Sequence, residues 1–425
     1  MKRKLATLVA IGMLGTMGLA ACSGSDAKGS DGQSGSAEGS PAGTLNFYTD
    51  KAAWKSDFEK MNVASEEAIG VDLKTTGYSD ANQYDAFIKQ AMRTKESPGL
   101  FTWHTGETLQ DLVADGLIAE TTDIWKDAIG EGWVTEELRD AYTIDDKQYC
   151  VPLNVAYWVM FYNKQIFEDN GFNEPETYEE LTSMVETLKG KGIAPIYQMT
   201  FLFNFPWIEH LIASTNPDLW YGLQDGSIAW NDPRIIDIWN TWNDEEHAGW
   251  FTDPALDVDP ALGLKQGDYA MIPFGTFYAG NLAGAGVEES EYGAFLIPPV
   301  NASLDKFPVA FETGPLCVAE KSEQRDMGLE YSKWWMSPEA QSAWSEARGD
   351  VPYNPFAKTA NAVLQGISDS VDQKGLLYDR FIEAMPTPVV TAGDEAFSAF
   401  MANPTDPAAY ADKMQKVAEK YWSGK

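Results

Sequence analysis

The sequence is poor in the residues that most metal and catalytic sites require. Its 425 residues include three cysteines and three histidines, and no histidine is spaced with another histidine or with a cysteine as zinc and iron sites demand. The Gly-x-Ser-x-Gly elbow, the phosphate-binding glycine loop and the dinucleotide fingerprint are also missing. These absences predict a protein without a metal or cofactor and favour a function other than catalysis.

Basic residues are scarce as well. The chain has 31 Lys and Arg against 64 Asp and Glu, a formal net charge of −33. A surface of this sign repels phosphate backbones, so we expect no nucleic-acid partner. Adjacent acidic pairs such as Glu245-Glu246 arise by chance in so acidic a chain. No two carboxylates stand out as the pair that a glycosidase places across its cleft.

The N-terminus has the features of an export signal. Lys2-Arg3-Lys4 precedes an apolar stretch, Leu5 to Leu19, that is too short for a membrane span. Leu19-Ala20-Ala21-Cys22 follows and resembles the lipobox of bacterial lipoproteins, in which Cys22 would be the lipidated first residue. We expect a lipoprotein signal peptide over residues 1–21. Ordinary secretory cleavage beside a chance cysteine is the alternative.

Residues 22–43 are mainly Ser, Gly, Asp and Ala and have almost nothing to bury, which predicts a flexible tether. An anchor and a tether would hold a globular body at the extracellular face of the bacterial cell membrane. Two further cysteines, Cys150 and Cys317, could form a disulfide outside the cell or remain as buried free thiols. Their spacing does not decide between these states.

One central stretch organises the rest of the chain. Tyr149 to Phe167 is rich in β-branched and aromatic residues and carries no charge from Cys150 to Tyr162, which predicts a strand buried on both faces. The run is long for one strand of a single sheet. We hypothesise that it leaves one α/β lobe at about Asn154 and enters a second at about Tyr157, with the ligand in the cleft between the lobes.

The first lobe is predicted from alternating strand and helix patterns. Strands are expected at 44–49, 71–75 and 100–103, with helices at 52–64 and 84–92 between them. This order is typical of a largely parallel sheet, whose ligands bind beyond the carboxyl ends of the strands.

Aromatic residues are plentiful, with 15 Trp, 18 Tyr and 20 Phe, and several gather near predicted strand ends. Aromatic faces with a few polar groups suit a sugar, although core packing is equally expected for any one aromatic. The candidate ligand-binding residues are Asp50, Lys51, Trp103, His104, Thr105, Asn154, Tyr157, Trp158, Phe205, Trp207, Phe274, Thr276, Phe277 and Glu312.

The order of several short motifs resembles the extracellular solute-binding proteins of carbohydrate ABC importers, the maltose-binding-protein-like family 1. The resemblance begins at about Thr44 and rests on these segments: Leu100 to His104, Val151 to Lys164, Gly267 to Met271, Glu330 to Gln341, and Val351-Pro352. It implies that Asp50 and Lys51 are polar sugar contacts and that Phe277 replaces a sugar-stacking Trp. Ala156 departs from the pattern, because maltose-binding protein has an acidic sugar contact there.

The resemblance implies a two-lobed fold of type II with three interlobe crossings, near residues 154–157, 273–276 and 312–316. Lobe one would then comprise 44–154 plus 276–313, and lobe two 157–273 plus 316–425.

The implied function is capture of an oligosaccharide by a monomer and its delivery to the permease subunits of an ABC transporter, without chemical change. Two alternatives stay open. The same fold could bind a non-sugar solute such as a peptide, polyamine or iron complex, or the chain could be a surface-anchored glycoside hydrolase.

Overall fold

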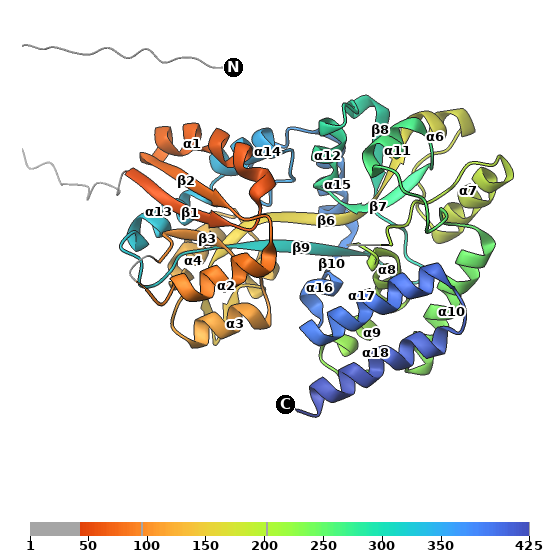
Figure 1. Ribbon diagram of the computed structural model, residues 1–425. Helices are drawn as coiled ribbons and strands as arrows, with labels where there is room; N and C mark the ends of the chain where they lie inside the picture. The colour runs from red at the N-terminus through yellow and green to blue at the C-terminus, as the bar shows by residue number, and fades with distance from the viewer. Residues whose placement is uncertain (1–42, 95–96, 201–202, 425) are drawn as a thin grey trace, which may run out of the picture. The chain divides into compact units, whose positions relative to one another are not determined.

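The computed structural model describes residues 43–94, 97–200 and 203–424 (Figure 1). They form the α/β fold that the sequence predicts. Lobe one is defined here by the hydrophobic cluster that contains Phe47 and Trp335. Lobe two is defined by two clusters, one containing Trp239 and the other Phe161. The predicted signal peptide, Cys22 and nearly all of the tether lie outside the described residues.

Lobe one is built on a sheet in which β1 (Gly43–Thr49) pairs in parallel with both β2 (Val71–Gly77) and β3 (Leu100–Thr102). This agrees with the predicted strands. The other elements of the lobe are η1 (Ala52–Trp54), α1 (Lys55–Ile69), α2 (Ala81–Ala91), α3 (Glu107–Ala114), α4 (Thr122–Gly130), α5 (Glu136–Asp140), β4 (Thr143–Ile144), β5 (Lys147–Gln148), α13 (Arg325–Trp335) and α14 (Pro338–Arg348).

Lobe two has three short strands: β7 (Met271–Gly275), β8 (Tyr292–Phe295) and β10 (Gly375–Asp379). Most of the lobe is helical, and the helical elements are α6 (Lys164–Asn170), α7 (Tyr178–Gly190), α8 (Pro206–Thr215), α9 (Pro217–Gln224), α10 (Pro233–Ala248), α11 (Pro260–Gln266), α12 (Tyr278–Gly284), η2 (Glu289–Glu291), α15 (Ala362–Lys374), α16 (Phe381–Ala384), α17 (Thr387–Ala402) and α18 (Pro407–Trp422).

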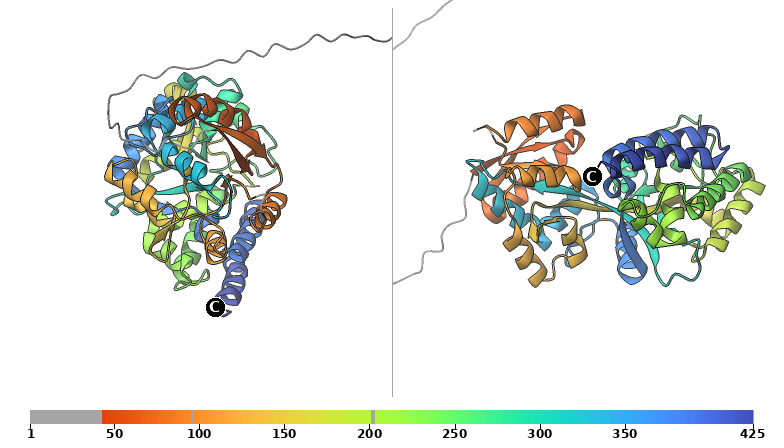
Figure 2. Two further views of the ribbon diagram at one scale, coloured as in Figure 1. Left: turned by 90° about the vertical axis from the view of Figure 1, so that its left-hand side faces the viewer. Right: turned by 90° about the horizontal axis from the view of Figure 1, so that it is seen from below.

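Two long antiparallel strands join the lobes. β6 (Val151–Asn163) and β9 (Phe307–Cys317) pair from Val151↔Leu316 to Tyr157↔Phe311, and they lie side by side in all views (Figure 2). β6 begins in the core of lobe one and ends in lobe two, where β7 and β8 pair with it. The uncharged run is long because it supplies a buried strand to each lobe in turn. The predicted crossing between Asn154 and Tyr157 falls within this strand.

The third crossing differs from the prediction. Residues 276–313 were expected in lobe one, but α12 packs in the Phe161 cluster and β8 pairs with the lobe-two half of β6. Conversely, α13 and α14 pack in lobe one. The chain therefore crosses between α14 and α15, and the predicted crossing at 273–276 is wrong. The cause is long-range strand pairing, which places β8 beside a strand about 130 residues earlier.

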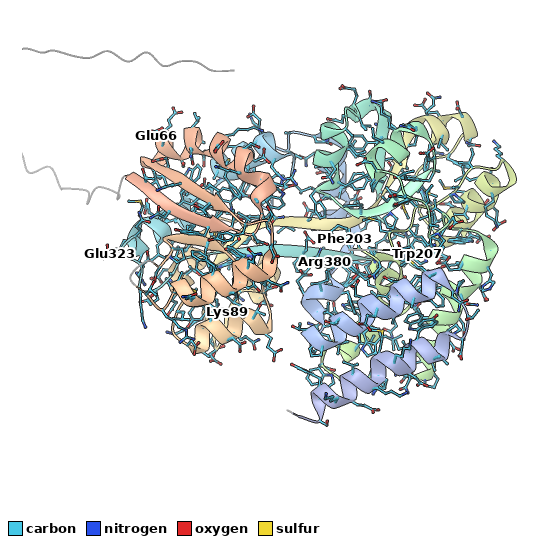
Figure 3. The ribbon with its side chains drawn as sticks, viewed as in Figure 1. Glu66, Lys89, Phe203, Trp207, Glu323 and Arg380 are labelled. Atoms are coloured by element: carbon cyan, nitrogen blue, oxygen red, sulfur yellow. A yellow bond between two sulfur atoms is a disulfide. The ribbon has the colours of Figure 1, made fainter. Side chains whose placement is uncertain are left out.

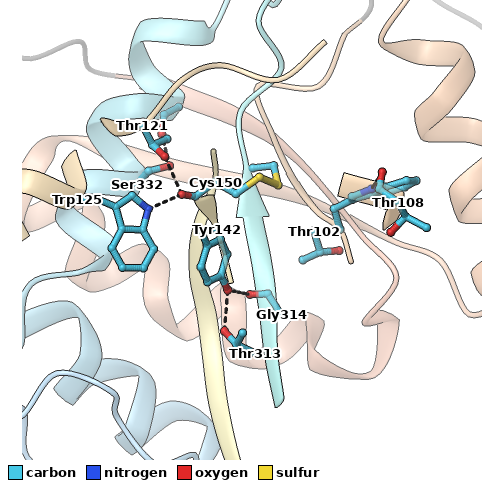
Figure 4. The surroundings of a disulfide bond; sticks show 12 residues. Thr102, Thr108, Thr121, Trp125, Tyr142, Cys150, Thr313, Gly314 and Ser332 are labelled. Carbon is cyan, nitrogen blue, oxygen red and sulfur yellow. Dashed lines mark hydrogen bonds between the residues drawn. A yellow bond between two sulfur atoms is a disulfide. The ribbon is translucent and has the colours of Figure 1, made fainter. Parts of the chain in front are cut away.

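A disulfide joins Cys150 to Cys317, which are separated by 167 positions (Figure 4). The bond ties the start of β6 to the end of β9 inside lobe one. Around it, Thr121 Oγ1 and Trp125 Nε1 donate hydrogen bonds to the Cys150 carbonyl at 2.8 and 2.9 Å. Of the two states that the sequence left open, the structure has the disulfide.

Candidate functional site

The paired strands carry a mixed polar and aromatic face where they pass between the lobes. Asn154 lies opposite Gly314, and Ala156 lies opposite Glu312. Directly opposed residues of an antiparallel pair project to the same side, and every second residue along a strand does so too. Asn154, Ala156, Trp158, Glu312 and Gly314 therefore belong to one side of the ribbon, which we call the shared face.

Lobe one contributes a carboxylate and a cation next to the shared face. Asp50 and Lys51 follow the carboxyl end of β1, as the sequence predicts. Asp50 Oδ1 accepts a 2.6 Å hydrogen bond from Thr102 Oγ1, and Asp50 Oδ2 lies 3.1 Å from Lys51 Nζ. Burial alone would raise the pKa of Asp50, but the Lys51 charge and the Thr102 hydroxyl outweigh it and lower the pKa. Asp50 is thus held as a partly buried anion.

Glycine at position 314 lets these groups converge on the shared face. A Cβ placed on Gly314 would lie 3.1 Å from Asn154 Oδ1 and 3.9 Å from Lys51 Cε. The first distance is tighter than ordinary van der Waals contact. The side chain of Asn154 and the end of Lys51 therefore lie next to the ribbon at its centre.

Lobe two contributes Arg380, which directly follows β10. Its guanidinium forms an ion pair with Glu312 on β9 and donates to Glu383 through Nε at 2.8 Å and Nη2 at 2.6 Å. It also lies 5.5 Å from the ring centroid of Trp158 and 5.8 Å from that of Phe205. Figure 3 labels Arg380 close to where β9 enters lobe two. Arg380 thus connects the charged and aromatic parts of the site.

Trp158 is surrounded by other aromatic rings. Its ring centroid lies 5.2 Å from that of Phe203, 5.4 Å from Phe205 and 6.1 Å from Phe277. These four residues form what we call the aromatic cluster. Gly275 lies opposite Trp158 in the β6–β7 pair, and a Cβ at that glycine would overlap the Phe277 ring. Glycine is therefore required for Phe277 to lie beside Trp158.

Four predicted ligand-binding residues have packing roles in this structure. Tyr157 projects to the opposite side of β6 from Trp158, and its backbone N–H donates to Thr276 Oγ1, which is fully buried. Trp207 is a core residue whose Nε1 donates to Glu245 at 2.7 Å. Phe274 is buried and stacks on Tyr278 with a centroid distance of 4.5 Å, and its ring centroid also lies 6.0 Å from that of Trp158, so it borders the aromatic cluster. For Tyr157, Trp207 and Thr276 the sequence identified aromatic or strand-end character correctly, but the side chains do not reach the shared face.

Three further predicted residues follow β3 in lobe one. Trp103 is 3% exposed and donates from Nε1 to the Thr108 carbonyl at 3.2 Å. His104 Nε2 lies 3.3 Å from Asp85 Oδ1 and is more exposed. The carbonyl of Thr105 accepts from Thr108 Oγ1. They lie just beyond Thr102, the partner of Asp50, so they border the lobe-one side of the site.

Arg380 and Glu383 were not predicted from the sequence. A signal for Arg380 was present, because this basic residue directly follows strand β10, much as Asp50-Lys51 follows β1. Among the described residues no group of three or more His, Cys, Asp or Glu is arranged to hold a metal ion. No helix in the described part of the chain is long and apolar enough to span a membrane.

Comparison with known proteins gives consistent matches over most of the chain. The sequence profile described as "Bacterial extracellular solute-binding protein" matches residues 53–368. The diacetylchitobiose binding protein DasA of Streptomyces coelicolor is 27% identical over 83% of this chain and 82% of its own length. The alpha-glucosides-binding periplasmic protein AglE of Rhizobium meliloti is 26% identical over 52% of this chain and 49% of its own length.

Solved structures share the fold. The bacterial solute receptor AcbH is described as having an exclusive preference for β-D-galactopyranose. Its structure superposes with a TM-score of 0.76 at 19% identity, covering 90% of this chain and 100% of the other. A chitin oligosaccharide binding protein superposes with a TM-score of 0.74, also at 19% identity, covering 89% of this chain and 98% of the other. At this level of identity the likeness concerns the fold alone.

Proposed function

The chain belongs to the bacterial extracellular solute-binding proteins, and from this we propose that it captures an oligosaccharide outside the cell and delivers it unchanged to the permease of an ABC transporter. The family fits a secreted or periplasmic location. Its relatives are named as binding proteins, which favours binding over catalysis.

The observation that carries this proposal is the convergence of both lobes on the shared face. Asp50 and Lys51 come from lobe one, Arg380 comes from lobe two, and Asn154 and Glu312 lie on the strands between them. Sugars offer C–H faces that pack on aromatic rings and hydroxyl groups that bond to charged and amide side chains. A site with the aromatic cluster at one end and these polar groups along it matches both needs.

The identity of the sugar is left to experiment, because similar proteins are named for different sugars. DasA is named for diacetylchitobiose and AglE for alpha-glucosides. Another protein of the same fold, RafE, was solved with raffinose. We favour an oligosaccharide, since the polar groups and the aromatic cluster extend along both crossing strands.

Binding would act through the relative position of the lobes. A sugar that contacts residues from both lobes at once favours conformations in which the lobes approach, and shifts the population toward them. The permease would then recognise that form. Tyr142 and the disulfide hold β9 on the lobe-one side, since Tyr142 Oη lies 2.6 Å from Thr313 Oγ1.

Anchoring at the membrane follows from the N-terminal motif. We propose that Cys22 is lipidated and that residues 22–43 tether a monomeric binding body to the extracellular face of the membrane. Detergent phase partitioning tests this: the native protein enters the detergent phase, and Cys22→Ser stays in the aqueous phase. Equal partitioning of both would contradict lipidation at Cys22.

Calorimetric titration of the purified protein tests the function itself. The panel contains diacetylchitobiose, raffinose, galactose, and malto-, xylo- and manno-oligosaccharides, with amino acids, a peptide and a polyamine as non-sugar arms. We expect saturable binding of one sugar class and recovery of the sugar intact. If only an amino acid, the peptide or the polyamine bound, the ligand would be a non-sugar solute. Recovery of a cleaved sugar would identify a hydrolase.

A further inference from the structure

We propose that Arg380 determines which sugars bind, by donating its two terminal N–H groups to neighbouring hydroxyls of an uncharged sugar, and that Glu312 and Glu383 exclude sugars bearing a carboxylate or phosphate. This inference rests on the proposed function, because it names the substrate class of the same site. It follows from the contacts of one side chain and from the charge around it.

The contacts of Arg380 leave one N–H on each terminal nitrogen for a ligand. An arginine side chain has five N–H groups in a fixed plane. Contacts with Glu383 use the Nε proton and one Nη2 proton, and the ion pair with Glu312 uses one on Nη1. One proton on each terminal nitrogen remains, and the two nitrogens are neighbours in the guanidinium plane. Two such donors fit neighbouring oxygen acceptors, either a carboxylate or a pair of adjacent hydroxyls.

Charge decides between these two ligands. The single positive charge of Arg380 already faces the two negative charges of Glu312 and Glu383, so this group carries a net charge of −1. The three side chains are only 11%, 17% and 19% exposed, and charges with so little solvent contact are weakly screened. A carboxylate or phosphate on the ligand would add to a negative cluster. A hydroxyl pair adds no charge, and each hydroxyl can also donate a proton to a carboxylate oxygen.

Arg380 is held in position before any ligand arrives. The backbone N–H of the next residue, Phe381, donates at 2.8 Å to the buried carboxyl of Glu209. The guanidinium rests against the rings of Trp158 and Phe205. Trp158 and Phe205 are only 5% and 2% exposed, so these two rings hold the guanidinium, and the half-buried Phe203 and Phe277 are the rings of the cluster that a sugar can reach. The neighbouring hydroxyls of such a sugar therefore meet donors that are already fixed. Preorganisation of this kind reduces the entropy lost on binding.

The test compares matched sugars. The purified protein is titrated with galactose and galacturonate, cellobiose and cellobiouronate, and maltose and maltobiouronate, each pair differing by one carboxylate. We expect binding of a neutral member at least tenfold tighter than its acidic analogue. Equal or tighter binding of the acidic analogue would overturn the inference while leaving the proposed function intact. A sugar that binds in the wider panel described above is compared with its own acidic analogue in the same way. If no sugar binds in either experiment, the proposed function fails and the inference fails with it.

Two substitutions separate selectivity from folding. Arg380→Lys keeps the charge and removes the planar pair of donors, so neutral-sugar binding should weaken at least tenfold. Glu383→Gln removes one negative charge, so the affinity for the acidic analogue should rise relative to the neutral sugar. A purely structural role for these residues would leave that ratio unchanged. Lys333→Gln is the matched control, since Lys333 pairs with Asp127 in lobe one, away from the site, at 2.8 Å.

Discussion

Ala156 and Glu312 lie directly opposite each other on β6 and β9, and both belong to the shared face. The pattern that the sequence resembles has an acidic sugar contact at position 156, where this chain has alanine. The structure has a carboxylate on the neighbouring strand instead, at Glu312. Ala156 is 1% exposed, so its small side chain leaves room for the Glu312–Arg380 ion pair.

An acidic residue at position 156 should therefore destabilise the protein. Ala156→Asp would add volume to a filled position and place two like charges opposite each other, with an expected cost of about 1–3 kcal/mol in the free energy of unfolding. Urea denaturation measures the cost, and Ala156→Ser is the control for size. Unchanged stability of the Asp variant would mean that the space opposite Glu312 is larger than described.

The disulfide should contribute strongly to stability. Replacing both Cys150 and Cys317 with Ser opens a covalent loop of 167 positions, and we expect the free energy of unfolding to fall by about 2–4 kcal/mol. Reductant should lower the denaturation midpoint of the native protein and leave that of the double variant unchanged. Insensitivity of both proteins to reductant would contradict the bond.

Asp50 should matter for sugar binding more than for folding. Asp50→Asn removes the negative charge that Lys51 and Thr102 stabilise. Because hydrogen bonds to charged groups contribute about 1.5–3 kcal/mol, we expect affinity to fall by about 10- to 100-fold. Calorimetry on the bound sugar measures this, with Asp72→Asn on β2 as the control. If Asp50→Asn and Asp72→Asn bound the sugar with equal affinity, Asp50 would not be a sugar contact.

Stability should fall as the pH rises from about 4.5 to about 7, most steeply above 6.5. Burial raises the pKa of Glu245 and of Glu246 to about 7 from 4.5, so the folded state retains protons that the unfolded chain has already released. The free energy of unfolding therefore decreases as the pH rises from 4.5 through about 7. Burial lowers the pKa of His210 to about 4 from 6.5, which opposes this trend only between pH 4 and 6.5.

Thermal unfolding measured between pH 5 and 8 shows whether stability falls or rises with pH. Glu246→Gln is uncharged at every pH, so its stability should decline less steeply across the upper part of this range. A native protein that became more stable from pH 6.5 to 8 would show that these carboxyl groups are ionised in the folded state.

Local patterns in the sequence predicted the N-terminal strands and helices of lobe one and the long strand that follows them. The strands near Leu45, Leu73 and Phe101 alternate with helices, and each segment carries its own periodicity. The run from Cys150 to Tyr162 predicted a shared strand because no single lobe needs so long an uncharged segment. These features depend on neighbours in the chain, which the sequence displays directly.

The remaining features depend on pairing between distant segments. β8 has four residues, and only its partner on β6 assigns it to lobe two. Tyr157 and Trp158 are adjacent and both aromatic, on a strand buried on both sides, so composition could not tell which of them belongs to the shared face. Arg380 enters the site because β10 pairs in parallel with β9, a contact without a local signal.

The Cys150–Cys317 bond also determines how the chain responds to tension applied at its two ends. Force passes through the cross-link and bypasses the residues that it encloses, which include all of β6, β7 and β8 and all of β9 except Cys317 itself. At about 3.6 Å per extended residue, roughly 600 Å of contour length stays hidden until the bond is reduced. The two parts of lobe two therefore respond differently to tension. The C-terminal helices α15 to α18 can unfold, while β7 and β8 are shielded by the cross-link.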